Sequence, residues 1–203
     1  MALPPTDKII FILGAPGSGK GTLCKKMSLH LNNNNNNHNN NKPDTDCCCI
    51  HLSVGDYLRH LSRDDESIRG YLRASKLIPA DKLVTILRKR IEELRGNKDE
   101  DGKEKVVWLI DGFPRDEDSL ILFEAEIGKP TKTIVLACPG QVAAERYLSR
   151  GRETMDDPAR WYTRFREYER NMVAIRQRLS NVVEVNAGGK PEECFENFKA
   201  VFD

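Results

Sequence analysis

Residues 14–22 read Gly14-Ala15-Pro16-Gly17-Ser18-Gly19-Lys20-Gly21-Thr22, and the chain is organised around these residues. It follows the apolar run at residues 9–13 and precedes a helical pattern. This order of strand, glycine-rich turn and helix is typical of a phosphate-binding loop. The glycines let successive N–H groups face one hollow, and the following helix directs its positive end toward the same place. Because Lys20 adds a full charge, the stretch predicts a site that binds several phosphate oxygens.

One position departs from the general loop pattern G-x-x-x-x-G-K-[ST]. Gly21 stands where a hydroxyl that binds Mg²⁺ usually lies, and Thr22 follows one residue later. Either the metal is held through water molecules or Thr22 reaches it. The alternative, a turn without a ligand, is disfavoured because the lysine, the glycines and both flanking elements agree.

Composition excludes several classes of protein. The 203 residues predict one domain, and 32 basic against 31 acidic residues leave a net charge of +1, too small to attract nucleic acid or membranes. No apolar run approaches the roughly 20 residues that cross a bilayer, and residues 1–8 lack the apolar core of a secretory signal. Six cysteines show no metal-binding spacing, and adjacent ones make poor disulfide partners. We expect reduced thiols in a cytoplasmic protein, with the nucleus as the alternative.

Apolar runs near residues 9–13, 50–52, 106–110, 133–137 and 182–185 alternate with helical patterns. This alternation predicts an α/β fold: a three-layer P-loop architecture with a five-stranded parallel sheet and helices on both faces. Ligands in such sheets bind at the carboxyl ends of the strands, where the loop and residues 111–115 follow. A helix is predicted from Lys20 to Leu31. The asparagine-rich residues after it cannot bury apolar surface, so residues 32–46 are expected to form a disordered insertion.

Arginines recur after the loop, and one carboxylate ends a buried strand. Arginine forks onto two phosphate oxygens at once, and phosphoryl transfer between two polyanions needs several such forks. Arg115 lies just beyond the strand predicted at residues 106–110, in the segment 111–115 that follows it. Asp111 ends that strand and suits either the water shell of a Mg²⁺ ion or the cap of the next helix. The candidate arginines are Arg59, Arg115, Arg146, Arg150 and Arg164.

Motifs in a fixed order span the whole chain: G-A-P-G-S-G-K-G-T at 14–22, H-L-S-V-G-D-Y-L-R at 51–59, L-I-P at 77–79, L-I-D-G-F-P-R at 109–115, E-R-Y-L-S-R-G at 145–151, R-F-R-E-Y at 164–168 and V-N-A-G-G at 185–189. With these motifs the chain resembles a nucleoside monophosphate kinase of the adenylate kinase and UMP-CMP kinase family, in its short-lid form. The resemblance implies transfer of the γ-phosphoryl of ATP, bound with Mg²⁺, to a nucleoside monophosphate. It also implies a monomer.

The resemblance carries site residues over to this chain. It implies catalytic roles for Lys20, Arg115, Arg150 and Arg164, and a water-mediated Mg²⁺ contact for Asp111. It implies ATP binding by Gly17, Ser18, Gly19, Lys20, Gly21, Thr22, Arg146, Arg150 and Gly189. It implies binding of the acceptor by Val54, Arg59, Lys76, Leu77, Ile78, Gly112, Arg115, Ser119 and Arg164. Residues 55–90 would form an acceptor-binding subdomain and residues 150–157 a short lid, and both would close to exclude water.

The sequence departs from the family pattern at several of these positions. The lid at residues 151–157 is shorter than usual, and Thr154 stands where the lid arginine belongs. Ser75 replaces a glycine, and Ser119 stands where an amide usually reads the acceptor base. Adenylate kinases usually have threonine where this chain has Val54, which disfavours AMP. UMP and CMP are therefore slightly favoured as acceptors. The alternative hypothesis is a catalytically weak homologue that binds nucleotides as a regulatory or interaction module.

Overall fold

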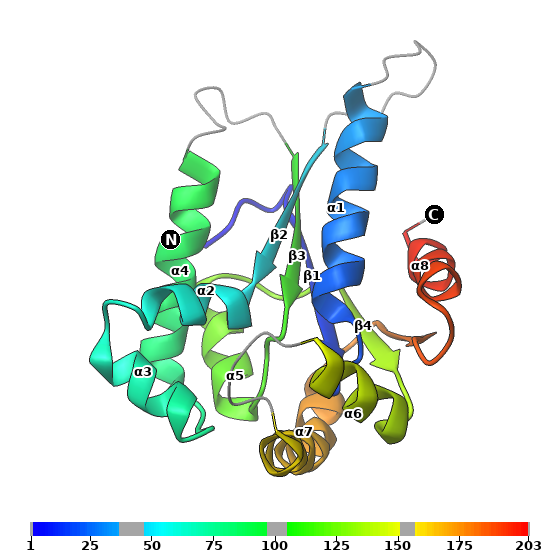
Figure 1. Cartoon of the computed structure of the whole chain (residues 1–203). Coiled ribbons are helices and arrows are strands. Elements are labelled where there is room, and N and C mark those ends of the chain that lie inside the picture. The colour runs from blue at the N-terminus through cyan, green and yellow to red at the C-terminus, as the bar shows by residue number, and fades with distance from the viewer. Residues whose placement is uncertain (1, 37–46, 97–104, 151–156, 203) are drawn as a thin grey trace.

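The computed structural model describes residues 2–36, 47–96, 105–150 and 157–202. A five-stranded, all-parallel sheet has the strand order β2-β3-β1-β4-β5, which confirms the predicted fold class. Figure 1 shows the strands pointing toward one edge, where α2, α6 and α7 gather. The strands are β1 (Lys8–Gly14), β2 (Cys47–Ser53), β3 (Lys105–Asp111), β4 (Lys132–Ala137) and β5 (Val182–Asn186).

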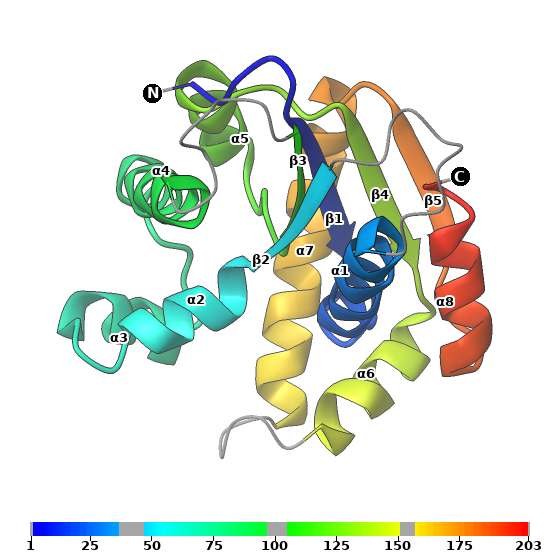
Figure 2. The same cartoon turned by 90° about the horizontal axis from the view of Figure 1, so that it is seen from above.

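Helices cover both faces of this sheet. Figure 2 shows α1 and α8 on one side of the sheet and α4 and α5 on the other. The helices are α1 (Lys20–Asn36), α2 (Val54–Leu61), α3 (Glu66–Arg73), α4 (Ala80–Gly96), α5 (Glu117–Glu126), α6 (Gly140–Ser149), α7 (Pro158–Arg178) and α8 (Pro191–Lys199). No helix in these described ranges is long and apolar enough to cross a membrane.

The central strand β1 supplies a core to each face. Phe11 packs its ring edge-on against Phe113 and Phe123, with centroids 5.5 and 5.4 Å apart, in the core under α4, α5 and α7. Ile12, the next residue, points into the opposite core with Met27 of α1. Successive side chains of a strand face opposite ways, so a strand covered on both faces is apolar throughout. The rigid centre of the sheet therefore holds the loop that follows β1.

The pairing register of β1 with its two neighbours determines which residues lie together at the carboxyl end of the sheet. Ile12 of β1 pairs with Asp111 of β3, and Gly14 pairs with Leu136 of β4. Asp111 and the start of the phosphate-binding loop consequently lie at one end of neighbouring strands. The sequence predicted that both segments lie at one edge, because each follows a strand and parallel strands end at the same edge of a sheet.

Helix α1 is longer than predicted. It continues to Asn36 and does not end at Leu31, so the expectation of disorder is wrong for residues 32–36, while residues 37–46 lie outside the described ranges. The amide of Asn32 explains the difference: it donates to the Cys49 carbonyl at 3.0 Å and accepts from the Cys49 N–H at 2.8 Å. Because β2 is an edge strand, this side chain satisfies backbone groups that no further strand pairs.

A buried carboxylate ties the opposite end of the sheet together. Asp7 is 7% exposed and precedes β1. It accepts hydrogen bonds from the guanidinium of Arg95, at the end of α4, and from Nε1 of Trp108, at 3.0 Å, in β3. A charge this deeply buried needs partners of this kind to offset its desolvation. The cluster therefore stabilises the end of the sheet that lies away from the candidate site.

Candidate active site

The phosphate-binding loop joins β1 to α1 and is seated on α6. Gly17 has a φ of +91°, in the left-handed region, and a Cβ there would lie 1.9 Å from the carbonyl oxygen of Ala143. Only glycine permits this close approach. Gly19 also has a positive φ, of +94°, but its Cβ position is open, so its requirement is conformational alone.

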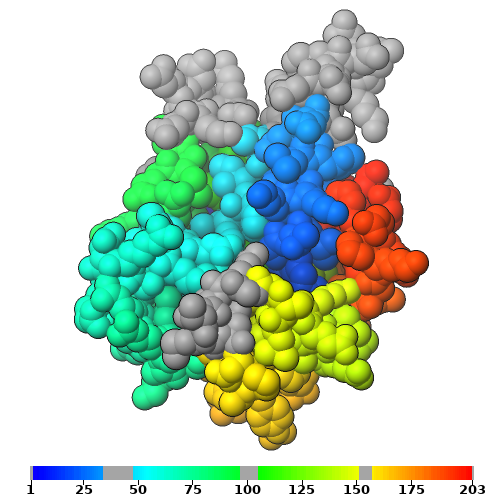
Figure 3. Space-filling view, in the orientation of Figure 1, coloured from blue at the N-terminus to red at the C-terminus, as the bar shows by residue number. Residues whose placement is uncertain are grey.

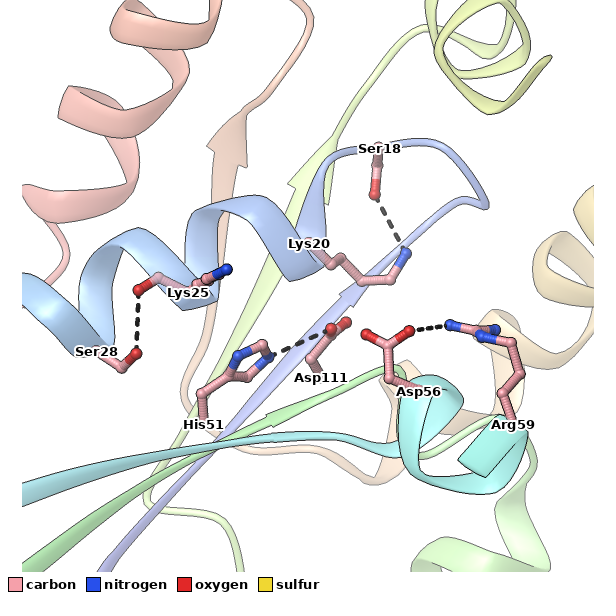
Figure 4. Close-up of polar contacts among 8 residues, drawn as sticks. All are labelled: Ser18, Lys20, Lys25, Ser28, His51, Asp56, Arg59 and Asp111. Carbon is pink, nitrogen blue, oxygen red and sulfur yellow. Dashed lines mark hydrogen bonds and ion pairs between the residues drawn. The ribbon is translucent and has the colours of Figure 1, made fainter. Parts of the chain in front are cut away.

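Lys20, the first residue of α1, folds back onto the loop (Figure 4). Its Nζ donates to the carbonyl oxygens of Gly14, at 2.7 Å, and Ala15, at 2.8 Å, and lies 3.3 Å from Ser18 Oγ. Burial lowers the pKa of Lys20 from 10.5 to about 8; the charge of Asp111 opposes this shift and the site arginines add to it. A desolvated ammonium group at this position favours the approach of a phosphate oxygen.

Asp111 approaches the loop from the neighbouring strand. It is 6% exposed, and its Oδ2 lies 3.5 Å from Nε2 of His51 in β2 (Figure 4). Asp111 and Thr22 both line the cavity described below, and carboxylate and hydroxyl oxygens are hard ligands that suit Mg²⁺. Within the described residues, no group of three or more His, Cys, Asp or Glu side chains forms a metal cage. This donor set fits an ion that keeps water molecules and binds phosphates.

A cavity of about 430 Å³ opens at this edge of the sheet. Figure 3 shows α2 and α3, in cyan and green-blue, on one flank of this edge and α6, in yellow-green, on the other. The loop and five arginines line this cavity, so it suits polyanions. The predicted site residues among its lining are Gly17, Ser18, Gly19, Lys20, Gly21, Thr22, Arg59, Asp111, Gly112, Arg115, Arg146, Arg150 and Arg164.

Two guanidinium groups converge above the start of α2. A Cβ placed on Gly55 would lie 3.5 Å from nitrogens of both Arg59 and Arg115. Arg115 is fixed by its Nε, which donates to the Gly112 carbonyl at 3.0 Å, and Arg59 pairs with Asp56. Burial, together with the nearby charge of Arg164, lowers the pKa of Arg115 to about 10. Like charges held together in a poorly solvated site repel one another, and a bound anion would relieve this repulsion.

Helices α6 and α7 supply the other three arginines of the cavity, Arg146, Arg150 and Arg164. The guanidinium of Arg150 lies 4.1 Å from the centre of the Tyr147 ring, and that of Arg164 lies 5.8 Å from it. Both cations are therefore placed by one buried aromatic ring. Arg146 donates to the carbonyl oxygens of Ala187, at 2.6 Å, and Gly189, at 2.7 Å, and so connects α6 to the segment after β5.

Other predicted residues lie outside the cavity lining. Val54 and Ile78 are buried in the core, at 1% and 4% exposure. Ser119 is fully buried, and its hydroxyl donates to the Asp116 carbonyl at 3.1 Å, so it does not face the cavity. Gly189 does not line the cavity, but its carbonyl oxygen accepts from two lining residues, Arg146 at 2.7 Å and the Cys194 thiol at 3.3 Å. Lys76 and Leu77 do not line the cavity, and Thr154 lies outside the described residues.

Helix α7 contributes a face that the sequence reasoning missed. Glu167, Tyr168, Met172 and Ile175 join Arg164 in lining the cavity. Their spacing of three and four residues, counted from Arg164, is the helical signal that could have identified them. Burial raises the pKa of Glu167, and Arg115 opposes this rise. The cavity lining therefore contains a second carboxylate, beside Asp111, as well as cations.

Comparisons with known proteins agree with this geometry. The family described as an AAA domain matches residues 13–161. UMP-CMP kinase of Danio rerio is 30% identical over 210 residues, which cover 97% of this chain and 97% of that protein. UMP-CMP kinase 3 of Arabidopsis thaliana is 30% identical over 204 residues, covering 96% and 88%, and uridylate kinase of Saccharomyces cerevisiae is 27% identical over 206 residues, covering 96% and 90%. The chain therefore belongs to the nucleoside monophosphate kinases of the adenylate kinase and UMP-CMP kinase family.

Proposed function

We propose that this chain transfers the γ-phosphoryl of ATP to a nucleoside monophosphate, giving ADP and a nucleoside diphosphate. One observation carries the proposal: Lys20 and the phosphate-binding loop share a single cavity with Arg59, Arg115 and Arg164. A nucleotide hydrolase transfers the phosphoryl group to water and needs no set of cations for a second phosphate-bearing substrate. The additional buried cations favour a second phosphate-bearing substrate that faces the first.

The donor ATP binds on the loop side. Its phosphates lie over residues 17–22, where Lys20 Nζ exchanges its loop carbonyls for phosphate oxygens. Arg146 and the segment that ends at Gly189 lie near its base. A Mg²⁺ ion bound with ATP would be held through water by Asp111 and would neutralise charge on the phosphates.

The acceptor monophosphate binds between Arg59 and Arg115. Their guanidinium groups already converge over Gly55, which leaves backbone rather than side chain beneath the phosphate. Residues 55–90 form the acceptor-binding subdomain in this proposal. The lid proposed at residues 150–157 falls almost entirely outside the described residues.

Positioning and charge stabilisation supply the catalysis. In this proposal Arg150 and Arg164, which both line the cavity and are placed by Tyr147, stabilise the transferring phosphoryl group. Their guanidinium groups are preorganised, so little reorganisation is needed as charge develops. Removal of water from the cavity keeps the phosphoryl group from hydrolysis.

UMP and CMP are proposed as preferred acceptors, because the relatives named above are UMP-CMP and uridylate kinases and because Val54 is unlike the adenylate kinase pattern. The purified protein is incubated with MgATP and AMP, UMP, CMP or GMP, and diphosphates are separated by ion-exchange chromatography. Formation of UDP and CDP at higher rates than ADP formed from AMP supports the proposal. ATP binding with no diphosphate from any acceptor favours the catalytically weak homologue instead.

We also infer that the protein is cytoplasmic and monomeric.

A further inference from the structure

The first turn of α7 contacts two separate segments, one in the proposed acceptor-binding subdomain and one in the phosphate-binding loop that lines the cavity. Nη2 of Arg160 donates to the carbonyl oxygen of Leu72, in the last turn of α3, at 2.8 Å. Nε1 of the next residue, Trp161, donates to the carbonyl oxygen of Pro16, in the phosphate-binding loop, at 3.0 Å. Neither Arg160 nor Trp161 lines the cavity itself. Two adjacent residues thus hold one segment of the proposed acceptor-binding subdomain and one segment of the proposed ATP site.

This turn is built to be rigid. Asp157 caps it, with Oδ1 accepting from the backbone N–H of Arg160 at 2.8 Å. Trp161 stacks on Phe165, with centroids 4.7 Å apart and an interplanar angle of 20°. Phe165 in turn lies against the start of α6, because a Cβ on Gly140 would be 3.4 Å from its Cζ. A displacement of α3 that moves Arg160 therefore also moves Trp161 and its contact with the phosphate-binding loop.

The two bonds point in different directions for a simple geometric reason. Successive residues of an α-helix are turned by about 100° around its axis, so neighbours reach different walls. Arg160 also places a positive charge at the carboxyl end of α3, where the helix dipole is negative, which strengthens that contact. Both acceptors are main-chain carbonyls, and these move only when their segments move.

We propose that the first turn of α7 couples the two nucleotide sites, with Arg160 and Trp161 as positioning residues. An acceptor that draws α3 toward the cavity pulls on Arg160, and the same turn sets the phosphate-binding loop through Trp161. Occupancy of one site thereby raises affinity at the other, and thermodynamic reciprocity makes the effect equal in both directions. This inference rests on the proposed function.

Calorimetric titration tests the coupling directly. The affinity for an unreactive ATP analogue with a nitrogen between its β- and γ-phosphates is measured with and without saturating UMP. We expect UMP to raise that affinity in the wild-type protein by about fivefold or more, the lower end of typical coupling. Arg160→Met should reduce the factor to near one while changing each separate affinity less than about threefold. Arg160→Lys, which keeps a donor, should restore part of it.

Two further variants complete the design. Arg166→Met is the matched control, because Arg166 is an exposed arginine of the same helix, and it should retain the wild-type factor. Trp161→Phe keeps the stacked ring but removes the donor, so it should also lose the coupling and, in addition, the change in tryptophan fluorescence on binding the analogue. The other tryptophan, Trp108, is fully buried and bonded to Asp7.

Equal coupling factors in Arg160→Met, Trp161→Phe and Arg166→Met would overturn the inference and leave the proposed function intact. A wild-type protein that binds both nucleotides without coupling would also overturn it alone. A wild-type protein that forms no diphosphate from any acceptor overturns the proposed function, and this inference with it. Trp161→Phe decides the question if Arg160→Met does not fold.

Discussion

Lys20 Nζ lies 2.7 Å from the carbonyl oxygen of Gly14, so the cation of the phosphate-binding loop is satisfied by the loop's own backbone. The ammonium group is buried, and its charged form is disfavoured by that burial. A phosphate oxygen offers it a far stronger partner than a neutral carbonyl. The loop is thus prepared for an anion by the poor solvation of its lysine.

Lys20→Ala should lower kcat/KM for ATP by about 100-fold to 1000-fold, because a preorganised charge at the transferring group is removed. Steady-state assays of diphosphate formation measure this loss. Lys25→Ala is the matched control, since Lys25 is an exposed lysine on the same helix. Near-normal turnover of the Lys20 variant would contradict the assigned role of the loop.

Binding of the ATP analogue should weaken in alkaline solution. Lys20 in the free protein loses its proton as the pH rises through about 8, so the affinity stays constant well below that pH and falls above it. The fall approaches about tenfold per pH unit, as expected for one linked proton. Lys20→Arg keeps its charge over this range and should flatten the profile in calorimetric titrations between pH 6 and 10. An equally steep profile in that variant would assign the proton to another group.

Arg115→Met should raise the KM for the acceptor and lower kcat, reducing kcat/KM by about 100-fold or more, while the affinity for the ATP analogue alone changes little. The reason is that Arg115 faces Arg59 across Gly55 on the acceptor side. Arg88→Met serves as control, because Arg88 pairs with Glu126 on the surface. The proposed acceptor site is excluded if the loss falls on ATP binding instead.

Asn32→Ala should lower the free energy of unfolding by about 1–3 kcal/mol, because the backbone groups of Cys49 lose their partner on the edge of the sheet. Asn33→Ala, at an exposed neighbouring position, should be neutral or slightly stabilising because alanine is the better helix former. Urea denaturation compares the two variants. Equal stability of the two alanine variants would refute the structural role of Asn32.

Deletion of residues 37–41 should leave the rate of turnover almost unchanged.

Asp7→Ala should destabilise the fold by about 3–5 kcal/mol, since it leaves Arg95 without its carboxylate and Trp108 without its acceptor. The KM values for both nucleotides should remain as in the wild type, because Asp7 lies at the end of the sheet away from the cavity. Thermal unfolding and steady-state assays at a permissive temperature separate the two effects. Altered KM values with unchanged stability would show that this reasoning is wrong.

The sheet and most of the cavity could be predicted because they depend on local patterns. Unbroken apolar runs identify strands buried on both faces, and parallel pairing brings Lys20, Asp111 and Arg115 to one edge. The end of α1 could not be predicted in this way. Asparagine is a poor helix former, and the bonds between Asn32 and Cys49 join residues that only the fold brings together.

The same limit applies to the first turn of α7. The contacts of Arg160 with Leu72 and of Trp161 with Pro16 are single bonds to main-chain carbonyls, which leave no periodic trace in a sequence. The prediction that Ser119 contacts the acceptor differs from the structure for the opposite reason, since it relied on a local motif. Its position in a motif suggested a base contact, whereas the local turn directs its hydroxyl to the carbonyl of Asp116.

In the proposed function, two nucleotides meet head to head in one cavity between Lys20 and Arg115. Inhibition by a bisubstrate compound, adenosine joined to uridine through five phosphates, tests it most directly. We expect binding of one molecule per chain and inhibition that is competitive with both ATP and UMP. Competition with ATP alone, with UMP still able to bind the inhibited protein, would contradict it.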